Sequence, residues 1–123
     1  MDIEASLKEI IGEIMDIDPE NIHPDTYLIR DLNMESIDLL ELGVSINHTF
    51  KIEVDEDIAF LKDLRFNLDK LKNNSNLQGK SLLKIYPHLA IDRAEEILQD
   101  LDNGPVLKFK DVVSYIEFMK NKG

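Results

Sequence analysis

Apolar residues recur at steps of three and four along most of this chain, and that spacing limits the fold more than any other feature. The spacing predicts helices over residues 3–15, 36–50, 58–71, 82–86, 92–101 and 112–119. Residues 16–33 carry prolines and scattered polar residues, which predicts a long loop. The nearest strand signal, residues 106–109, is very short. We therefore expect an all-α fold.

The expected ends of the later helices rest on local signals. Asn73 to Asn76 should end the helix over residues 58–71, and Pro87 should stop the next, short helix. Asp92 is placed to cap the following helix. Gly104 and Pro105 should close that helix.

The length and composition fit one globular domain spanning residues 1–123. With 123 residues and no cysteine, the chain can form a core without disulfides, which suits a cytoplasmic protein. Residues 1–4 lack the basic flank and apolar run of a signal peptide. No stretch approaches the roughly 18 apolar residues of a membrane span. We expect a cytoplasmic monomer that does not insert into membranes.

The charge is concentrated in the first half of the chain. Residues 1–60 hold 16 acidic and three basic residues, whereas residues 61–123 hold nine acidic and eleven basic ones, so the first half accounts for the net charge of -11. This half would repel nucleic acid and attract a basic protein surface. The other interpretation is that the acidic residues only keep the protein soluble.

The helix over residues 36–50 has two apolar stripes on nearly opposite sides. At about 100° per residue, the first stripe contains Leu39, Leu42, Ile46 and Phe50, and the second contains Ile37, Leu40 and Val44. A surface helix of a small domain needs only one such stripe. The helix is therefore either buried on both sides or presents its second stripe, beside acidic residues, to partners.

Ser36 stands at the start of this helix, and its position allows two interpretations. A serine there commonly caps the helix by accepting a hydrogen bond from a free backbone amide. The unpaired amides and the helix dipole also favour an anion at this place, so the site suits a phosphodiester. Local physics does not choose between the two.

The sequence around this serine resembles the acyl carrier protein family. The similar residues are Asp31-Leu32-Asn33-Met34-Glu35-Ser36-Ile37-Asp38-Leu39-Leu40-Glu41-Leu42, followed by Phe50-Lys51-Ile52-Glu53-Val54. Residues 110–116 look like the family's last helix, and the resemblance covers roughly residues 3–60 and 106–119. It implies a four-helix bundle with additional inserted helices. It also implies a carrier that shuttles thioester-bound acyl chains between enzymes of a fatty-acid, lipid or specialised pathway.

The resemblance also implies site residues. Ser36 would carry 4′-phosphopantetheine derived from coenzyme A. The surface for the phosphopantetheinyl transferase and for acyl-handling enzymes with basic surfaces would contain Glu35, Ile37, Asp38, Leu40, Glu41 and Val44. The acyl cavity would be lined by Ile46, Val54 and Ala59.

Residues 62–104 exceed a compact carrier and read as a helical insertion. One hypothesis is that the insertion covers or enlarges the acyl-binding side for a long or unusual chain. The other is that it adds only stability.

No site for metal binding or catalysis is expected. His23, His48 and His88 are far apart and have no metal-ligand spacing, and no nucleophile with a base and an orienting residue can be assembled. We expect no enzyme activity of the chain itself. The alternative function is a carrier-like interaction module that is never modified.

Overall fold

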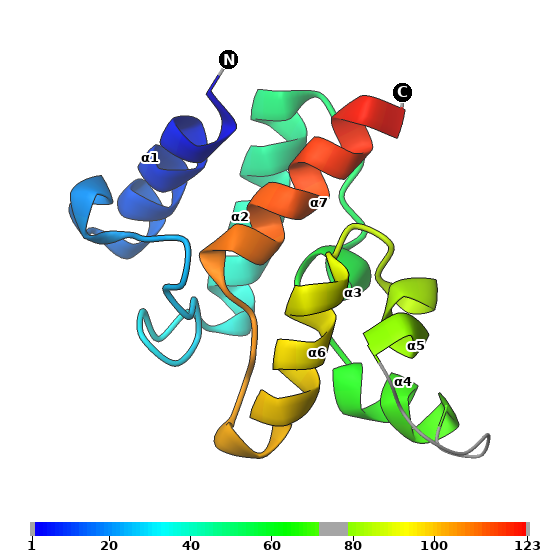
Figure 1. Cartoon of the computed structure of the whole chain (residues 1–123). Helices are drawn as coiled ribbons and strands as arrows, with labels where there is room; N and C mark the ends of the chain where they lie inside the picture. Colours follow the sequence, from blue (N-terminus) through cyan, green and yellow to red (C-terminus); the bar gives the residue numbers. More distant parts are fainter. Residues whose placement is uncertain (1, 72–78, 123) are drawn as a thin grey trace.

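The chain folds into helices joined by turns and loops, as the computed structural model in Figure 1 shows. The structure describes residues 2–71 and 79–122. Its elements are α1 (Ile3–Met15), η1 (Pro19–Asn21), α2 (Ser36–Phe50), α3 (Glu56–Ala59), α4 (Leu64–Leu71), α5 (Gly79–Ile85), α6 (Ile91–Asp100), η3 (Leu101–Asn103) and α7 (Phe109–Lys122). The described residues contain no strand, only an isolated bridge between Tyr27 and Lys108. The all-α prediction is confirmed.

Helices α1, α2 and α7 pack together around the main core. Asp2 caps α1 by accepting a hydrogen bond from the Ala5 amide at 3.2 Å. The apolar spacing of α1 places Leu7 and Ile11 on one face, where both are fully buried. Both α1 and α2 have the bounds that the sequence predicts.

The predicted loop between α1 and α2 is present and is fixed to the start of α7. The Leu28 amide donates to the carbonyl of Leu107 at 3.0 Å, and the Phe109 amide donates to that of Thr26 at 2.9 Å. Leu28 itself is fully buried. The loop therefore holds the residues before α2 against the second half of the chain.

The prediction of one continuous helix over residues 58–71 is wrong. The chain instead forms two helices, α3 and α4, with a turn between them. The Lys62 amide donates to the Asp57 carbonyl, and Leu61 adopts a left-handed φ of 55°, which together end α3. Glycine usually occupies that position, but burial of the Leu61 side chain offsets the strain. The expected helix end at Asn73–Asn76 lies outside the described residues.

Figure 1 shows α4, α5 and α6 gathered in the lower part of the view, with α5 packed against both α4 and α6. Helix α6 begins at Ile91 with Ala90 as its N-terminal cap, so the predicted cap Asp92 is wrong; Asp92 lies in the first turn. Gly104 follows η3 with a φ of 121°, as expected for a glycine that closes a helical segment.

A buried ion pair fastens α6 to α7. The Arg93 Nε and Nη2 atoms donate to the two carboxylate oxygens of Asp111 at 2.7 and 2.8 Å. The second Asp111 oxygen also accepts from the Lys108 amide at 2.8 Å. Burial alone would lower the pKa of Arg93, but hydrogen bonds to Asp111 and the charge of that carboxylate raise it above its ordinary value.

Within the residues that the structure describes, no helix is long and apolar enough to cross a membrane.

Candidate functional site

Ser36 is the first residue of α2, and its side chain is exposed. The position before it, the N-terminal cap, belongs to Glu35, whose amide donates to Asp38 Oδ2 at 2.8 Å. The interpretation of Ser36 as the helix cap is therefore wrong. Among the described residues, none forms a hydrogen bond with the Ser36 hydroxyl. The helix start is stabilised without it, so the hydroxyl is free to react.

The surroundings of Ser36 fit a covalently attached phosphodiester. The amino end of α2 has a positive partial charge, which stabilises an anion in the first turn by roughly 0.3–1 kcal/mol. The carboxylates of Glu35 and Asp38 oppose that effect, but Glu35 is exposed and water screens its charge. An accessible hydroxyl on an ordered first turn is what a transferring enzyme must reach.

The two apolar stripes of α2 differ in their exposure to solvent. Exposed fractions are at most 5% in the first stripe, which contains Leu39, Leu42, Ile46 and Phe50. In the second stripe, Ile37 is 66% exposed, Leu40 is 48% exposed and Val44 is 63% exposed. The hypothesis of a helix buried on both sides is therefore wrong, because the described residues leave the second stripe open to solvent.

Acidic side chains border this exposed stripe. Glu35 and Glu41 are exposed, and Asp38 is half-buried near the helix start. We call the six residues Glu35, Ile37, Asp38, Leu40, Glu41 and Val44 the α2 face. An apolar centre with a charged rim is the usual composition of a protein-binding surface.

The three residues predicted to line an acyl cavity are not equally accessible. Ile46 and Ala59 are fully buried, whereas Val54 is half-buried. Val54 lines a small hollow of about 200 Å³ with Gly43, Val44, Asn47 and Glu56. The acyl cavity stays a prediction.

Comparisons with known proteins agree with this geometry. Residues 5–65 match the family described as "Phosphopantetheine attachment site". The acyl carrier protein of Chlamydia trachomatis serovar L2 is 37% identical over 48% of this chain and 77% of its own length. The chain belongs to the acyl carrier protein family. The acyl carrier proteins of Desulforapulum autotrophicum (38% identical, 48% of this chain, 78% of the relative) and Buchnera aphidicola (32% identical, 59% and 94%) are further relatives.

Family membership defines the prosthetic group and the class of protein. The group is covalently attached 4′-phosphopantetheine, and the chain is a non-catalytic carrier rather than an enzyme. No solved structure matches the chain significantly. The family match ends at residue 65, so α5, α6 and α7 lie beyond it.

Two features were outside the reach of the sequence prediction. One is a set of contacts between α6 and residues distant in the sequence, which includes those from Arg93 to Asp111 and from Tyr27 to Asp100. The other is an apolar groove beside the second contact.

Among the residues that the structure describes, no group of three potential metal ligands comes together.

Proposed function

We propose that Ser36 carries the 4′-phosphopantetheine arm and that the protein shuttles acyl thioesters between enzymes of a fatty-acid, lipid or specialised pathway. The observation that supports this most directly is the free, exposed hydroxyl of Ser36 on the first turn of α2. Glu35 and Asp38 complete the helix start, so modification of Ser36 costs no structural hydrogen bond.

The modification transfers the phosphopantetheinyl unit of coenzyme A to this hydroxyl. The Ser36 oxygen forms a bond to the phosphorus of the phosphopantetheinyl unit of coenzyme A, and the pyrophosphate P–O bond breaks. The nucleoside bisphosphate leaves with the bonding electrons, and a base of the transferase takes the serine proton. The attached arm supplies a thiol that holds acyl chains as thioesters. The chain's own residues supply position and recognition.

The α2 face is the proposed docking surface for the transferase and for acyl-handling enzymes. Its exposed apolar residues can enter a shallow apolar pocket of the partner. Its carboxylates, within the acidic first half of the chain, would attract enzymes with basic surfaces and speed their association. Because Ser36 lies next to Ile37, one docked enzyme covers both the surface and the attachment point.

Intact mass tests the attachment. Apo protein is incubated with coenzyme A, Mg²⁺ and a promiscuous phosphopantetheinyl transferase. The wild type should gain the mass of one phosphopantetheinyl group, and Ser36→Ala should gain none. Ser45→Ala, a half-buried serine of the same helix, is the matched control and should react like the wild type. No gain on the wild type, or an equal gain on Ser36→Ala, would contradict the assignment.

Association kinetics test the docking surface separately. Val44→Ser should slow transfer to Ser36 by raising the Michaelis constant for the carrier, because an exposed apolar contact is lost. Ile91→Ser changes a partly exposed apolar residue of α6 and should have no effect. Association should also slow steeply with salt. Equal kinetics for both variants would exclude the α2 face.

A further inference from the structure

A mainly apolar depression lies where the inserted helices meet the loop before α2. It is a groove of about 490 Å³, in the size range of small-molecule sites. Its walls are Ile29 of the loop, four residues between Phe60 and Leu64 around the turn between α3 and α4, and six residues between Leu101 and Leu107 before α7. The apolar lining comes from Phe60, Leu61, Leu64, Val106 and Leu107, among others.

We infer that this groove, rather than the hollow at Val54, holds the distal part of the acyl chain on the phosphopantetheine arm. The inference rests on the proposed function, since it assumes an arm on Ser36. It assigns the end of the insertion, at Leu101 and Gly104, and the residues that follow it, up to Leu107, a direct contact with an apolar chain.

The groove is close to the attachment point along the chain. The Asn33 amide donates to the carbonyl of Ile29, a groove residue, at 3.0 Å. Asn33 precedes Ser36 by three residues, and consecutive Cα atoms are about 3.8 Å apart, so the two Cα atoms lie within about 11 Å. A long flexible arm on Ser36 can therefore deliver an acyl chain to the rim at Ile29.

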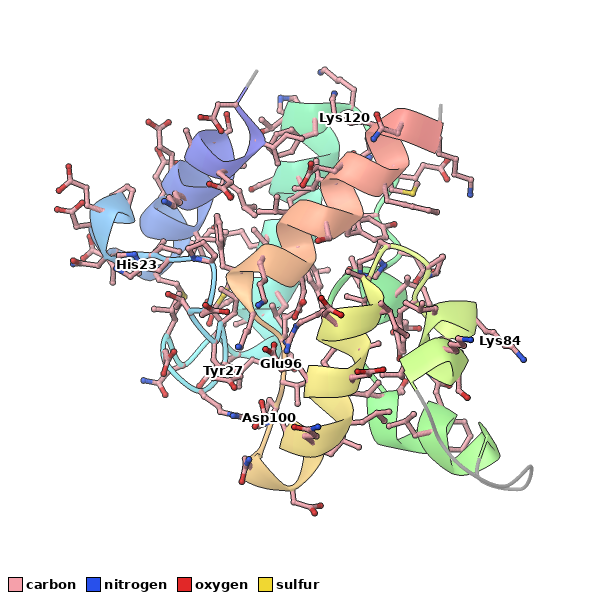
Figure 2. The ribbon with its side chains drawn as sticks, viewed as in Figure 1. His23, Tyr27, Lys84, Glu96, Asp100 and Lys120 are labelled. Carbon is pink, nitrogen blue, oxygen red and sulfur yellow. The ribbon has the colours of Figure 1, made fainter. Side chains whose placement is uncertain are left out.

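Two contacts hold the groove open in a defined shape. The Tyr27 hydroxyl donates to Asp100 Oδ2 at 2.7 Å, and Figure 2 shows these two side chains together at the end of α6. The Arg30 guanidinium donates to the carbonyl of Gly104, a groove residue, at 3.0 Å. The loop and the insertion are thus joined beside the groove. A preformed apolar site loses little entropy when it binds a chain.

The backbone of the opposite wall is strained. Leu61 and Asp63 both have left-handed φ angles, of 55° and 57°, and both line the groove. A bulky residue such as leucine rarely adopts this conformation, and such strain concentrates at ligand sites. The strained turn directs the chain away from a continuous helix and leaves room for the groove.

The hollow at Val54 is a poorer site for a long chain. It holds about 200 Å³, less than half the volume of the groove. Glu56 is one of its lining residues, and the Glu56 side chain lies against Gly43, where a Cβ on Gly43 would be 3.5 Å from Glu56 Cγ. Glu56 also pairs with Lys62 at 3.0 Å. An acyl chain in this hollow would lie against a charged side chain rather than an apolar wall.

The test compares matched substitutions at the two sites by NMR and thioester stability. Holo protein is loaded with acetyl, octanoyl and hexadecanoyl groups, and backbone amide shifts are recorded. In the wild type, shifts at Leu61 and Leu107 should grow with chain length, and hydrolysis of the long thioesters should slow. Ile29→Trp should remove the shifts and speed hydrolysis several-fold, while Val54→Trp should do neither. Ile29 and Val54 are both half-buried, so the two tryptophan substitutions should destabilise the fold to a similar extent.

The outcomes separate this inference from the proposed function. Decanol added to Ser36→Ala protein, which has no arm, should shift the same groove amides if the groove accepts an apolar chain. Loading of Ser36 with no groove shift at any length, or with shifts centred on Val54 and Ala59, overturns the inference alone. Failure of Ser36 to gain mass, with decanol still bound in the groove, overturns the proposed function instead. Absence of decanol shifts in the groove counts against the inference whatever the state of Ser36.

Discussion

Asp111→Asn should destabilise the protein by breaking the buried attachment of α6 to α7. Asp111 is fully buried, and its carboxylate accepts two hydrogen bonds from Arg93 and one from the Lys108 amide. Removing one partner of a buried ion pair typically costs 3–5 kcal/mol, roughly, because the other charge stays buried. The asparagine removes the negative charge, and its side-chain NH2 group, itself a donor, would face an N–H donor of Arg93.

The structure favours the lower end of that range. Arg93 keeps Glu96, whose carboxylate lies 2.7 Å from Nη1 and is half exposed, and it keeps the Val106 carbonyl at 2.6 Å. The Lys108 amide can still donate to the remaining oxygen of the asparagine. We therefore expect a loss of about 3 kcal/mol in the free energy of unfolding.

Urea unfolding at pH 7, followed by circular dichroism, measures this loss. Asp25→Asn is the control, because Asp25 pairs with Lys110 at 2.9 Å but is 71% exposed, and an exposed pair is worth less than about 1 kcal/mol. A similar, small loss for Asp111→Asn and Asp25→Asn would refute the reasoning. It would mean that water reaches Arg93 and that α6 is not fastened through this pair.

Three further outcomes are expected. Asp38→Ala should cost about 1 kcal/mol in urea unfolding through loss of its bond to the helix start, while Ser36→Ala should be neutral; the reverse order would restore the serine as the cap. Burial lowers the pKa of His88 from 6.5 to about 4, so His88 takes up a proton more readily in the unfolded chain than in the folded one. The contribution of His88 to stability is therefore complete above pH 6.5 and decreases as the pH falls below that value. Stability should fall by about 2 kcal/mol from pH 8 to pH 5, and His88→Phe should remove this dependence; an unchanged pH profile would contradict the assignment. Gly104→Ala should lose on the order of 1–3 kcal/mol in thermal unfolding, since its φ is 121° and the new Cβ would meet Arg30 Nε at 3.3 Å; a neutral effect would mean that the turn adapts.

The sequence predicts those elements whose signals are local. The bounds of α1 and α2 follow from apolar spacing over a few turns, and both are confirmed. Spacing alone does not say what covers an apolar face, so it leaves the exposure of Ile37 and Val44 undecided until the neighbouring helices are placed. Likewise, residue preferences favour serine over glutamate as an N-terminal cap, and the choice of Glu35 instead depends on the backbone angles that the fold imposes on these two adjacent residues.

The missed features depend on residues distant in sequence or on unusual backbone. Tyr27 and Asp100 are 73 residues apart and Arg93 and Asp111 are 18 apart, and neither separation leaves a periodic signal. The break between α3 and α4 requires Leu61 in a left-handed conformation, which residue preferences argue against. Its burial against the core supplies the compensation, and burial is a property of the whole fold.

These contacts also change how the two hypotheses for residues 62–104 relate to each other. A helical insertion that only added stability would need one attachment to the bundle, such as the one between Arg93 and Asp111. The second attachment, through Tyr27 and Arg30, reaches the loop that leads to Ser36. Gly104 both accepts from Arg30 and lines the groove, so the bond that stabilises the insertion also forms the groove wall. On the inference that the groove holds the acyl chain, a substitution that loosens this bond should reduce both the stability of the protein and its binding of the cargo.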